Sequence, residues 1–423
     1  MTTDTVAESI LTDIDQLGVL FSIQFDLIPA KKLPKDIAHF AIFMPKKGIV
    51  IHNGHENIEL KGIAASSTSK ICGIKVVEKN RGDVYSARVN LPSEKFGRNY
   101  PHIPASDRAA WQCEIDTRSS SSYALYVSSE NGSEHFVGSV SFEYLNAVRE
   151  QKTSPGIEAY IEGVKQSRLV AQEHTARGKK YLIVTGNPRS GTTSLGRLVN
   201  SSMEVFLGIE RYAKFNLASS AFEKDAFIAE GSQAAFKSAF LSESTEKMSL
   251  SERYDKATYI GDKRPGFALD WRSTMIQMPN MKIVYIFRDI MGVASSYNVR
   301  AQKAAQGKDS NWHATRNYSQ AVKEWNYEMS QACQMAKFVD IYFVKYEDFF
   351  CSTDKMQLLF EHLNVDGRNA DVISAIRAAS VIAKRKQHAR PELNDTQRSY
   401  IEENADYTEY KKLHKLYEQQ FLH

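Results

Sequence analysis

The stretch that most constrains the fold is YLIVTGNPRSGTTSLGRLVN, residues 181–200, in which an apolar run leads into a glycine-rich turn. Such a turn between a strand and a helix directs several backbone N–H groups at one point, and the helix dipole adds positive potential there. Gly186 and Gly191 have the spacing of a Walker A loop, but Thr192 stands where that loop has its lysine. The turn therefore predicts an anion site that lacks the usual contact to a β/γ-phosphate pair.

The side chains of this loop favour an anion over a simple turn. Arg189 is the one cation within it, and hydroxyl donors follow at Ser190, Thr192, Thr193 and Ser194. The alternative is an ordinary strand-to-helix turn with polar capping.

From Lys180 onward, apolar strands alternate with helical stretches. The expected strands are 181–186, 205–209, 258–261, 282–288 and 340–346, and the expected helices include 192–202, 290–304 and 314–337. This alternation predicts an α/β domain, a mainly parallel sheet with helices on both faces. Ligands of such sheets bind at the carboxyl ends of the strands.

A second candidate anion site follows the strand KIVYIFR. Arg288 ends this strand, and Ser296 lies eight residues later in the next helix. An arginine there can bind a phosphate with two parallel hydrogen bonds, and a serine hydroxyl can share its oxygens. On its own, the pair Arg288–Asp289 could equally be a salt bridge that caps the helix.

Together these segments resemble the sulfotransferases that use 3′-phosphoadenosine 5′-phosphosulfate (PAPS). PRSGTTSL, residues 188–195, resembles the family's loop for the 5′-phosphosulfate, and Arg288 with Ser296 resembles its 3′-phosphate element. VKYEDFF, residues 344–350, is similar to a further strand end of the family. The resemblance implies a P-loop-like sulfotransferase fold, PAPS as sulfuryl donor and no metal. The implied donor contacts are Pro188, Arg189, Ser190, Gly191, Thr192, Thr193, Ser194, Arg288 and Ser296.

The resemblance also bears on the chemistry. A donor with one phosphate and one sulfate at its 5′ end needs no Walker lysine, and Arg189 can neutralise its sulfuryl oxygens. No histidine occurs between Gly191 and Arg288, so a carboxylate base is implied. Glu210 is the first candidate, with Asp262 and His313 in reserve, His313 because residues 303–312 could form a lid. Lys263 is the implied stabiliser of developing charge.

The N-terminal half follows a different pattern. Short alternating runs such as ICGIKVVE and HFVGSVSFEYL are separated by turn residues, which predicts a smaller, mostly β, sandwich-like accessory domain at 1–150. Residues 151–178 are expected to form a helical connector, and 179–423 the sulfotransferase domain. NLPSEKFGRNYPHIP, residues 90–104, followed by AWQCEID, resembles β domains attached to glycan-modifying transferases, and this likeness favours a carbohydrate acceptor.

Composition limits the alternatives. The net charge of +4 is too balanced for a general nucleic-acid binder, and no apolar run approaches a membrane span. Four scattered cysteines and the absence of a signal-peptide pattern predict a cytoplasmic protein. The competing hypotheses are a P-loop kinase of a small metabolite and a non-catalytic nucleotide-binding module. The donor contact within the basic run 383–390 and the oligomeric state are left open.

Overall fold

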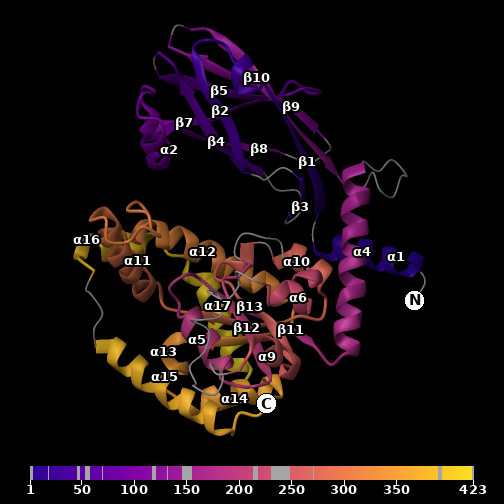
Figure 1. The fold of residues 1–423 in the computed structure, drawn as a ribbon. Coiled ribbons are helices and arrows are strands. Elements are labelled where there is room, and N and C mark those ends of the chain that lie inside the picture. Colours follow the sequence, from indigo (N-terminus) through magenta and orange to yellow (C-terminus); the bar gives the residue numbers. More distant parts are fainter. Residues whose placement is uncertain are drawn as a thin grey trace. The chain divides into compact units, whose positions relative to one another are not determined.

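The computed structural model describes residues 3–17, 19–44, 48–52, 58–68, 70–116, 121–130, 132–144, 155–212, 218–229, 248–269, 271–388 and 393–421. The chain divides into two compact units, Met1–Lys165 and Gln166–His423 (Figure 1). Each unit contains its own β-structure.

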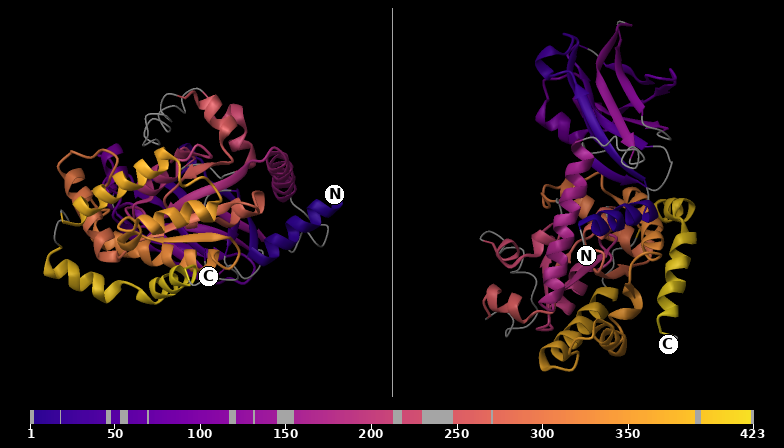
Figure 2. Two further views of the ribbon diagram at one scale, coloured as in Figure 1. Left: turned by 90° about the horizontal axis from the view of Figure 1, so that it is seen from below. Right: turned by 90° about the vertical axis from the view of Figure 1, so that its right-hand side faces the viewer.

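The strands of the first unit form two sheets, which can be followed in Figure 2. One has the order β3-β1-β10-β9-β5-β6 and the other β2-β4-β8-β7, and neighbouring strands pair antiparallel. The strands are β1 (Val19–Leu27), β2 (Ile37–Met44), β3 (Gly48–His52), β4 (Ile58–Ser66), β5 (Ile71–Glu78), β6 (Val84–Ser86), β7 (Arg88–Leu91), β8 (Ala110–Ile115), β9 (Ser121–Ser129) and β10 (Glu134–Tyr144). Helices α1 (Thr3–Leu17) and α2 (Glu94–Asn99) also lie in this unit.

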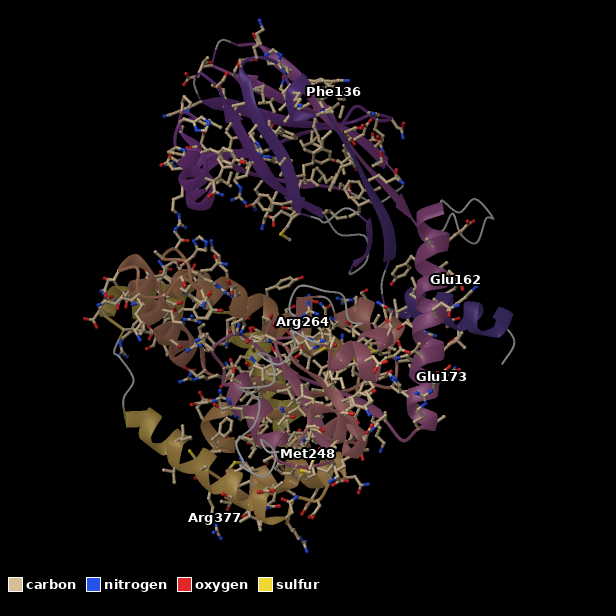
Figure 3. All side chains as sticks on the ribbon, viewed as in Figure 1. Phe136, Glu162, Glu173, Met248, Arg264 and Arg377 are labelled. Carbon is tan, nitrogen blue, oxygen red and sulfur yellow. The ribbon has the colours of Figure 1, made fainter. Side chains whose placement is uncertain are left out.

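Hydrophobic side chains from both sheets share one core. Phe40 of β2 stacks on Trp111 of β8 at a centroid distance of 5.6 Å, and Leu125 of β9 is buried in the same cluster. Along β10, buried Val137 follows Phe136, which is 44% exposed and points away from this core (Figure 3). An exposed side chain next to a buried one fits a sheet that packs one face on a core. The predicted smaller, mostly β domain with antiparallel sheets is confirmed.

The predicted connector contains α4 (Pro155–Ala176), and the boundary between the two compact units falls within this helix. Its later turns contact the second unit's own residues. The Nε of Arg168 donates to the carbonyl of Ile276 at 2.7 Å, and the hydroxyl of Ser167 donates to that of Ser219 at 3.2 Å. The functional division at residues 150 and 178 stays a prediction.

The second unit is built on a five-stranded sheet of order β12-β13-β11-β14-β15 in which every neighbouring pair is parallel. Its strands are β11 (Lys180–Gly186), β12 (Val205–Ile209), β13 (Tyr259–Lys263), β14 (Lys282–Phe287) and β15 (Ile341–Lys345). The chain fills one side of central β11 with β12 and β13, then crosses to β14 on the other side. Such a switch point opens a crevice at the carboxyl ends of the strands.

Helices cover both faces of this sheet, as predicted (Figure 1). On one face α5 (Thr192–Val199), α14 (Thr353–Leu363) and α15 (Ala370–His388) share a core with strand residues such as Val184 and Val284. On the other face the Tyr285 hydroxyl of β14 donates to the carbonyl of Glu328 in α12 (Tyr318–Met335), at 3.4 Å. Phe287 there contacts Tyr417 of α17 (Tyr407–Gln419). Further helices are α6 (Lys224–Phe227), α9 (Leu250–Lys256), α10 (Trp271–Gln277), α11 (Ile290–Ala305), α13 (Tyr346–Phe349) and α16 (Asp395–Asn404).

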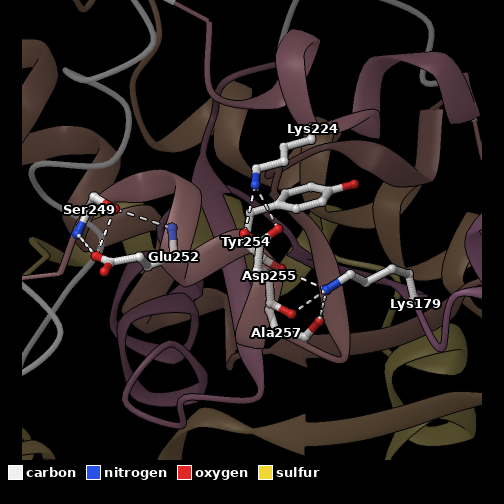
Figure 4. A network of polar contacts seen from close by, with 7 residues as sticks. All are labelled: Lys179, Lys224, Ser249, Glu252, Tyr254, Asp255 and Ala257. Atoms are coloured by element: carbon white, nitrogen blue, oxygen red, sulfur yellow. Dashed lines mark hydrogen bonds and ion pairs between the residues drawn. The ribbon is translucent and has the colours of Figure 1, made fainter.

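Lys179, the residue before the central strand β11, caps the carboxyl end of α9 (Figure 4). The Nζ of Lys179 donates to the carbonyls of Tyr254, Asp255 and Ala257 at 2.7, 3.0 and 2.5 Å. Lys224 meanwhile pairs with the Asp255 carboxylate at 2.7 Å. A cation at this end of a helix satisfies carbonyls that have no partner within the helix and complements the dipole.

We expect Lys179→Met to lower the free energy of unfolding of the second unit by roughly 1–3 kcal/mol, because three carbonyls lose a charged donor. Denaturant unfolding followed by tryptophan fluorescence measures this change. Lys256→Met, at an exposed position on the same helix, is the matched control and should change stability by no more than about 0.5 kcal/mol. Equal effects of the two substitutions would contradict the capping role.

Candidate active site

The glycine-rich loop has the tight backbone that its sequence predicts. It joins central β11 to α5, and Gly186, Arg189 and Gly191 have φ of 148°, 73° and 101°. A side chain at Gly186 would place its Cβ 1.9 Å from the carbonyl oxygen of Ile286. Glycine at 186 is thus required by close packing on β14, while Arg189 adopts a left-handed conformation that costs a non-glycine residue of order 1 kcal/mol or more.

The hydroxyl side chains of the loop gather at the amino end of α5. Ser190 is fully buried, and its Oγ has no hydrogen-bond partner among the described residues. Thr192 is buried, while Thr193 and Ser194 are half-buried in the first turn of the helix. A buried donor without a partner is costly in a folded protein, and an oxyanion held by this loop would satisfy it.

The two predicted anion elements lie next to each other. The Nε of Arg189 in the loop donates to the Oγ of Ser296 in α11 at 2.9 Å. The Nη1 of Arg288, at the end of β14, donates to the carbonyl of Arg189 at 3.1 Å. Residues about a hundred positions apart in the sequence are therefore in direct contact across the switch point between β11 and β14.

Arg288 does not take the alternative role of a capping partner for Asp289. Asp289 caps α11 by itself, because its carboxylate accepts the backbone N–H of Met291 at 2.9 Å. The Arg288 guanidinium instead lies over the ring of Tyr346, 4.3 Å from its centroid, and 3.9 Å from the Glu347 carboxylate. Burial raises the pKa of Glu347.

Two contacts that hold Arg288 were not predicted from the sequence. The Tyr346 ring packs so closely on the loop that a Cβ at Gly191 would lie 2.7 Å from it. A Cβ at Gly292, in the first turns of α11, would lie 2.8 Å from the Nε of Arg288. The sequence shows Tyr346 directly after a strand and Gly292 inside a helix. Neither feature indicates that the residue lies against Arg288.

Glu210 and Lys263 form an ion pair at the ends of β12 and β13. The Nζ of Lys263 contacts the Oε1 of Glu210. The lysine side chain is fully buried and the glutamate side chain is half exposed. Burial lowers the pKa of Lys263, and the nearby Glu210 opposes that shift. The half-exposed carboxylate is therefore accessible to a substrate, while the buried lysine holds it by the ion pair.

The reserve candidates lie differently. Asp262 is fully buried, and its two oxygens accept backbone N–H groups of Arg211 and Tyr212. His313 is exposed in the segment between α11 and α12, where its carbonyl accepts the N–H of Arg316 at 3.0 Å.

The segment predicted as a lid, residues 303–312, is held by contacts of its side chains with flanking residues. Arg300 of α11 pairs with Asp309 at 2.7 Å, and the Trp312 ring lies between the guanidinium groups of Arg300 and Arg316, with centroid distances of 4.6 and 4.4 Å. Tyr297 contacts the same ring edge-on. These contacts hold the segment beside α11. The sequence does not predict them, because aromatic and basic residues occur throughout the chain.

An apolar pocket of about 100 Å³ lies beside the loop. It is lined by Ser194 and Arg197 of α5, by Tyr346 and Phe350, and by Ala378, Ala379, Ile382 and Ala383 of α15. The predicted basic run 383–390 begins at this pocket, but its side chains beyond Ala383 lie outside the described residues.

Within the described ranges, no group of three or more His, Cys, Asp or Glu side chains could hold a metal ion. In that same part of the chain, no helix is both long and apolar enough to cross a membrane.

The fold and the site define an α/β protein with a phosphate-type loop at its central strand and no Walker lysine. Residues 182–368, less than half of the chain, match the model of the sulfotransferase family. This part of the chain is therefore similar to the sulfotransferase family, as the motifs predict. Comparison with curated proteins finds no significant match.

Solved structures of sulfotransferases are similar to about half of the chain. The sulfotransferase domain of the curacin biosynthetic pathway shares 14% identity over 53% of this chain and 97% of its own, with a TM-score of 0.34. A sulfotransferase of Mycobacterium tuberculosis shares 14% over 56% and 83%, with a TM-score of 0.33. One from Alicyclobacillus acidocaldarius shares 12% over 52% and 99%, with a TM-score of 0.30.

Proposed function

We propose that the protein transfers a sulfuryl group from PAPS to a hydroxyl group of a carbohydrate acceptor. One observation carries this proposal. Arg189 of the loop reaches Ser296, and Arg288 reaches the Arg189 backbone. Two candidate anion-binding elements in contact suit a ligand that has two anionic groups close together. PAPS is such a molecule, because one ribose carries its 5′-phosphosulfate and its 3′-phosphate.

The described side chains suit each part of this donor. The loop 188–194 with its hydroxyls and backbone N–H groups would hold the 5′-phosphosulfate, and the buried Ser190 hydroxyl would gain a partner. Arg288 and Ser296 would hold the 3′-phosphate. The apolar pocket lined by Tyr346 and the alanines of α15 would take the base.

The chemistry is an in-line displacement at sulfur. The acceptor oxygen forms a bond to sulfur while the bond from sulfur to the bridging phosphate oxygen breaks, and adenosine 3′,5′-bisphosphate leaves with that electron pair. Glu210 takes the hydroxyl proton, and its contact with Lys263 holds the carboxylate in place. Arg189 neutralises charge on the departing phosphate and on the sulfuryl oxygens.

The proposal also covers the acceptor and the location of the protein. Glu210 is half exposed, so an acceptor hydroxyl can approach it. A carbohydrate is favoured by the accessory β unit, and a cytoplasmic location by the four cysteines, which are scattered through the sequence without the spacing of a disulfide framework. Neither a nucleic acid nor a metal has a role in this proposal.

Thermal unfolding with nucleotides tests the donor. We expect adenosine 3′,5′-bisphosphate at about 100 times its dissociation constant to stabilise the protein by roughly 2.7 kcal/mol. ATP with magnesium should add little, because the loop has no lysine for a β/γ-phosphate pair. Differential scanning fluorimetry over a concentration series of each ligand measures the two effects. Stabilisation by ATP with magnesium, but not by the bisphosphate, would instead favour a small-metabolite kinase.

If the protein binds the bisphosphate but transfers no sulfuryl group to any hydroxyl acceptor, it would be a non-catalytic nucleotide-binding module. A panel of neutral and acidic glycans with radiolabelled PAPS decides between these two functions.

A further inference from the structure

The turn that carries Glu210 has an unusual backbone. Glu210 follows β12 with φ of 59°, in the left-handed region that non-glycine residues seldom occupy. Its N–H still donates to the carbonyl of Lys263 at 2.9 Å, which extends the ladder between β12 and β13 by one step. The chain then turns sharply, so the next two N–H groups need partners outside the ladder.

Asp262 supplies both partners. Its Oδ1 accepts the N–H of Arg211 at 3.2 Å, and its Oδ2 accepts that of Tyr212 at 3.0 Å. Gly208 lies opposite Asp262 in the register of β12 and β13, and a Cβ there would be 2.9 Å from Oδ1. The missing side chain at 208 therefore leaves the space that the carboxylate occupies.

The surroundings of Asp262 suit a structural acceptor better than a base. The side chain is fully buried, and burial raises the pKa of Asp262 to about 6. The two N–H groups, with Lys263 and Arg264, act in the opposite direction and favour the charged form. Both oxygens are already engaged by the backbone, whereas the Glu210 carboxylate next to this turn is half exposed.

We propose that Asp262 is a positioning residue: by accepting both N–H groups it fixes the left-handed turn that holds the Glu210 carboxylate against Lys263. Two further bonds fasten the same turn, since the Tyr212 hydroxyl donates to the carbonyl of Ala221 and the Arg211 guanidinium to that of Ala226. The catalytic part of this inference rests on the proposed function, whereas the backbone part does not.

Asp262→Asn tests the catalytic part. Asparagine has the same shape but presents an NH₂ group to one of the two N–H groups, so one bond is lost and the turn loosens. We expect kcat for sulfuryl transfer from PAPS to fall on the order of 100-fold, as displacement of a catalytic group by about 1 Å can produce. The KM for PAPS and the affinity for adenosine 3′,5′-bisphosphate should stay within about twofold, because the donor loop is untouched.

The pH profile separates positioning from proton transfer. If Glu210 is the base, Asp262→Asn keeps the shape of the kcat–pH curve at a lower level. Loss of the pH-dependent limb in Asp262→Asn, with its retention in Glu210→Gln, would make Asp262 the base and overturn the proposal. Unchanged kcat in a folded Asp262→Asn protein would overturn it as well.

A second variant keeps the test sharp if Asp262→Asn does not fold. Gly208→Ala leaves the carboxylate in place but pushes on its Oδ1, so kcat should fall while bisphosphate affinity is retained. Gly163→Ala, in α4, is the matched control, because a Cβ there meets no atom within 4 Å. Equal kcat values for the two alanine variants would contradict the proposal.

Hydrogen exchange tests the backbone part without any assay of activity. The N–H groups of Arg211 and Tyr212 should be protected in the intact protein, and at least tenfold less protected in Asp262→Asn and Gly208→Ala. This readout stands even if the protein binds no bisphosphate and the proposed function fails. Fast exchange of both groups in the unmodified protein would overturn the role of Asp262 in the turn.

Discussion

Replacing Glu210 by glutamine is expected to lower kcat for sulfuryl transfer by roughly 100-fold or more, because glutamine cannot accept the acceptor's proton. Glutamine keeps the size of the side chain and one oxygen that can accept a hydrogen bond from Lys263. Affinity for adenosine 3′,5′-bisphosphate should therefore stay within about twofold. Single-turnover kinetics with radiolabelled PAPS and a glycan panel measure the first quantity, and calorimetric titration measures the second.

Glu361→Gln is the matched control for this substitution. Glu361 is exposed on α14, so the same chemical change there removes a surface charge away from the phosphate loop. Its kcat should equal that of the unmodified protein. Retained turnover in Glu210→Gln would exclude Glu210 as the base and leave Asp262 or the exposed His313 as the candidate.

Arg288→Ala is expected to weaken the binding of adenosine 3′,5′-bisphosphate by roughly 2–5 kcal/mol, because a phosphate in a partly buried site loses its charged partner. The arginine side chain is 12% exposed and held between the loop carbonyl and the Tyr346 ring. Removing it should act on the 3′-phosphate alone. Adenosine 5′-monophosphate, which lacks that phosphate, should therefore bind the two proteins about equally.

The comparison of the two nucleotides gives this test its specificity. Arg368→Ala removes the same charge from an exposed position and should leave both affinities unchanged. If Arg288→Ala weakens both nucleotides equally, Arg288 supports the loop rather than the 3′-phosphate. If neither affinity changes, Arg288 lies outside the donor site.

Much of the second unit follows from local chemistry. The strand candidates 181–186 and 205–209 correspond to β11 and β12, because a strand buried on both faces is a short apolar run bounded by turn residues. Gly186 and Gly191 adopt positive φ, which the spacing of the loop requires. Arg288 and Ser296 were proposed from their place after a strand, where ligands of such sheets bind, and from the family resemblance of the two motifs. Their role as donor contacts stays a prediction.

The side-chain directions at the site could not be read in the same way. From the sequence, Arg288 could form an ion pair with Asp289 or bind another group. The orientation of its side chain depends on the ring of Tyr346, which follows another strand. Asp262 and Lys263 are adjacent ionisable residues at one strand end, yet one serves the backbone and the other pairs with Glu210. Successive residues of a strand point to opposite faces, so the neighbours on each face decide their roles.

The sequence by itself determined that the first unit has antiparallel sheets and the second a parallel one. It also determined the glycine-rich loop and the identity of the charged groups at the strand ends. These properties depend on residue type and on spacings of a few positions. Tertiary structure alone decided that Arg189 meets Ser296, and that Asp262 holds the turn of Glu210. The physical reason is that hydrogen bonds act over about 3 Å, and only the order and register of the strands bring residues so distant in the chain within that range.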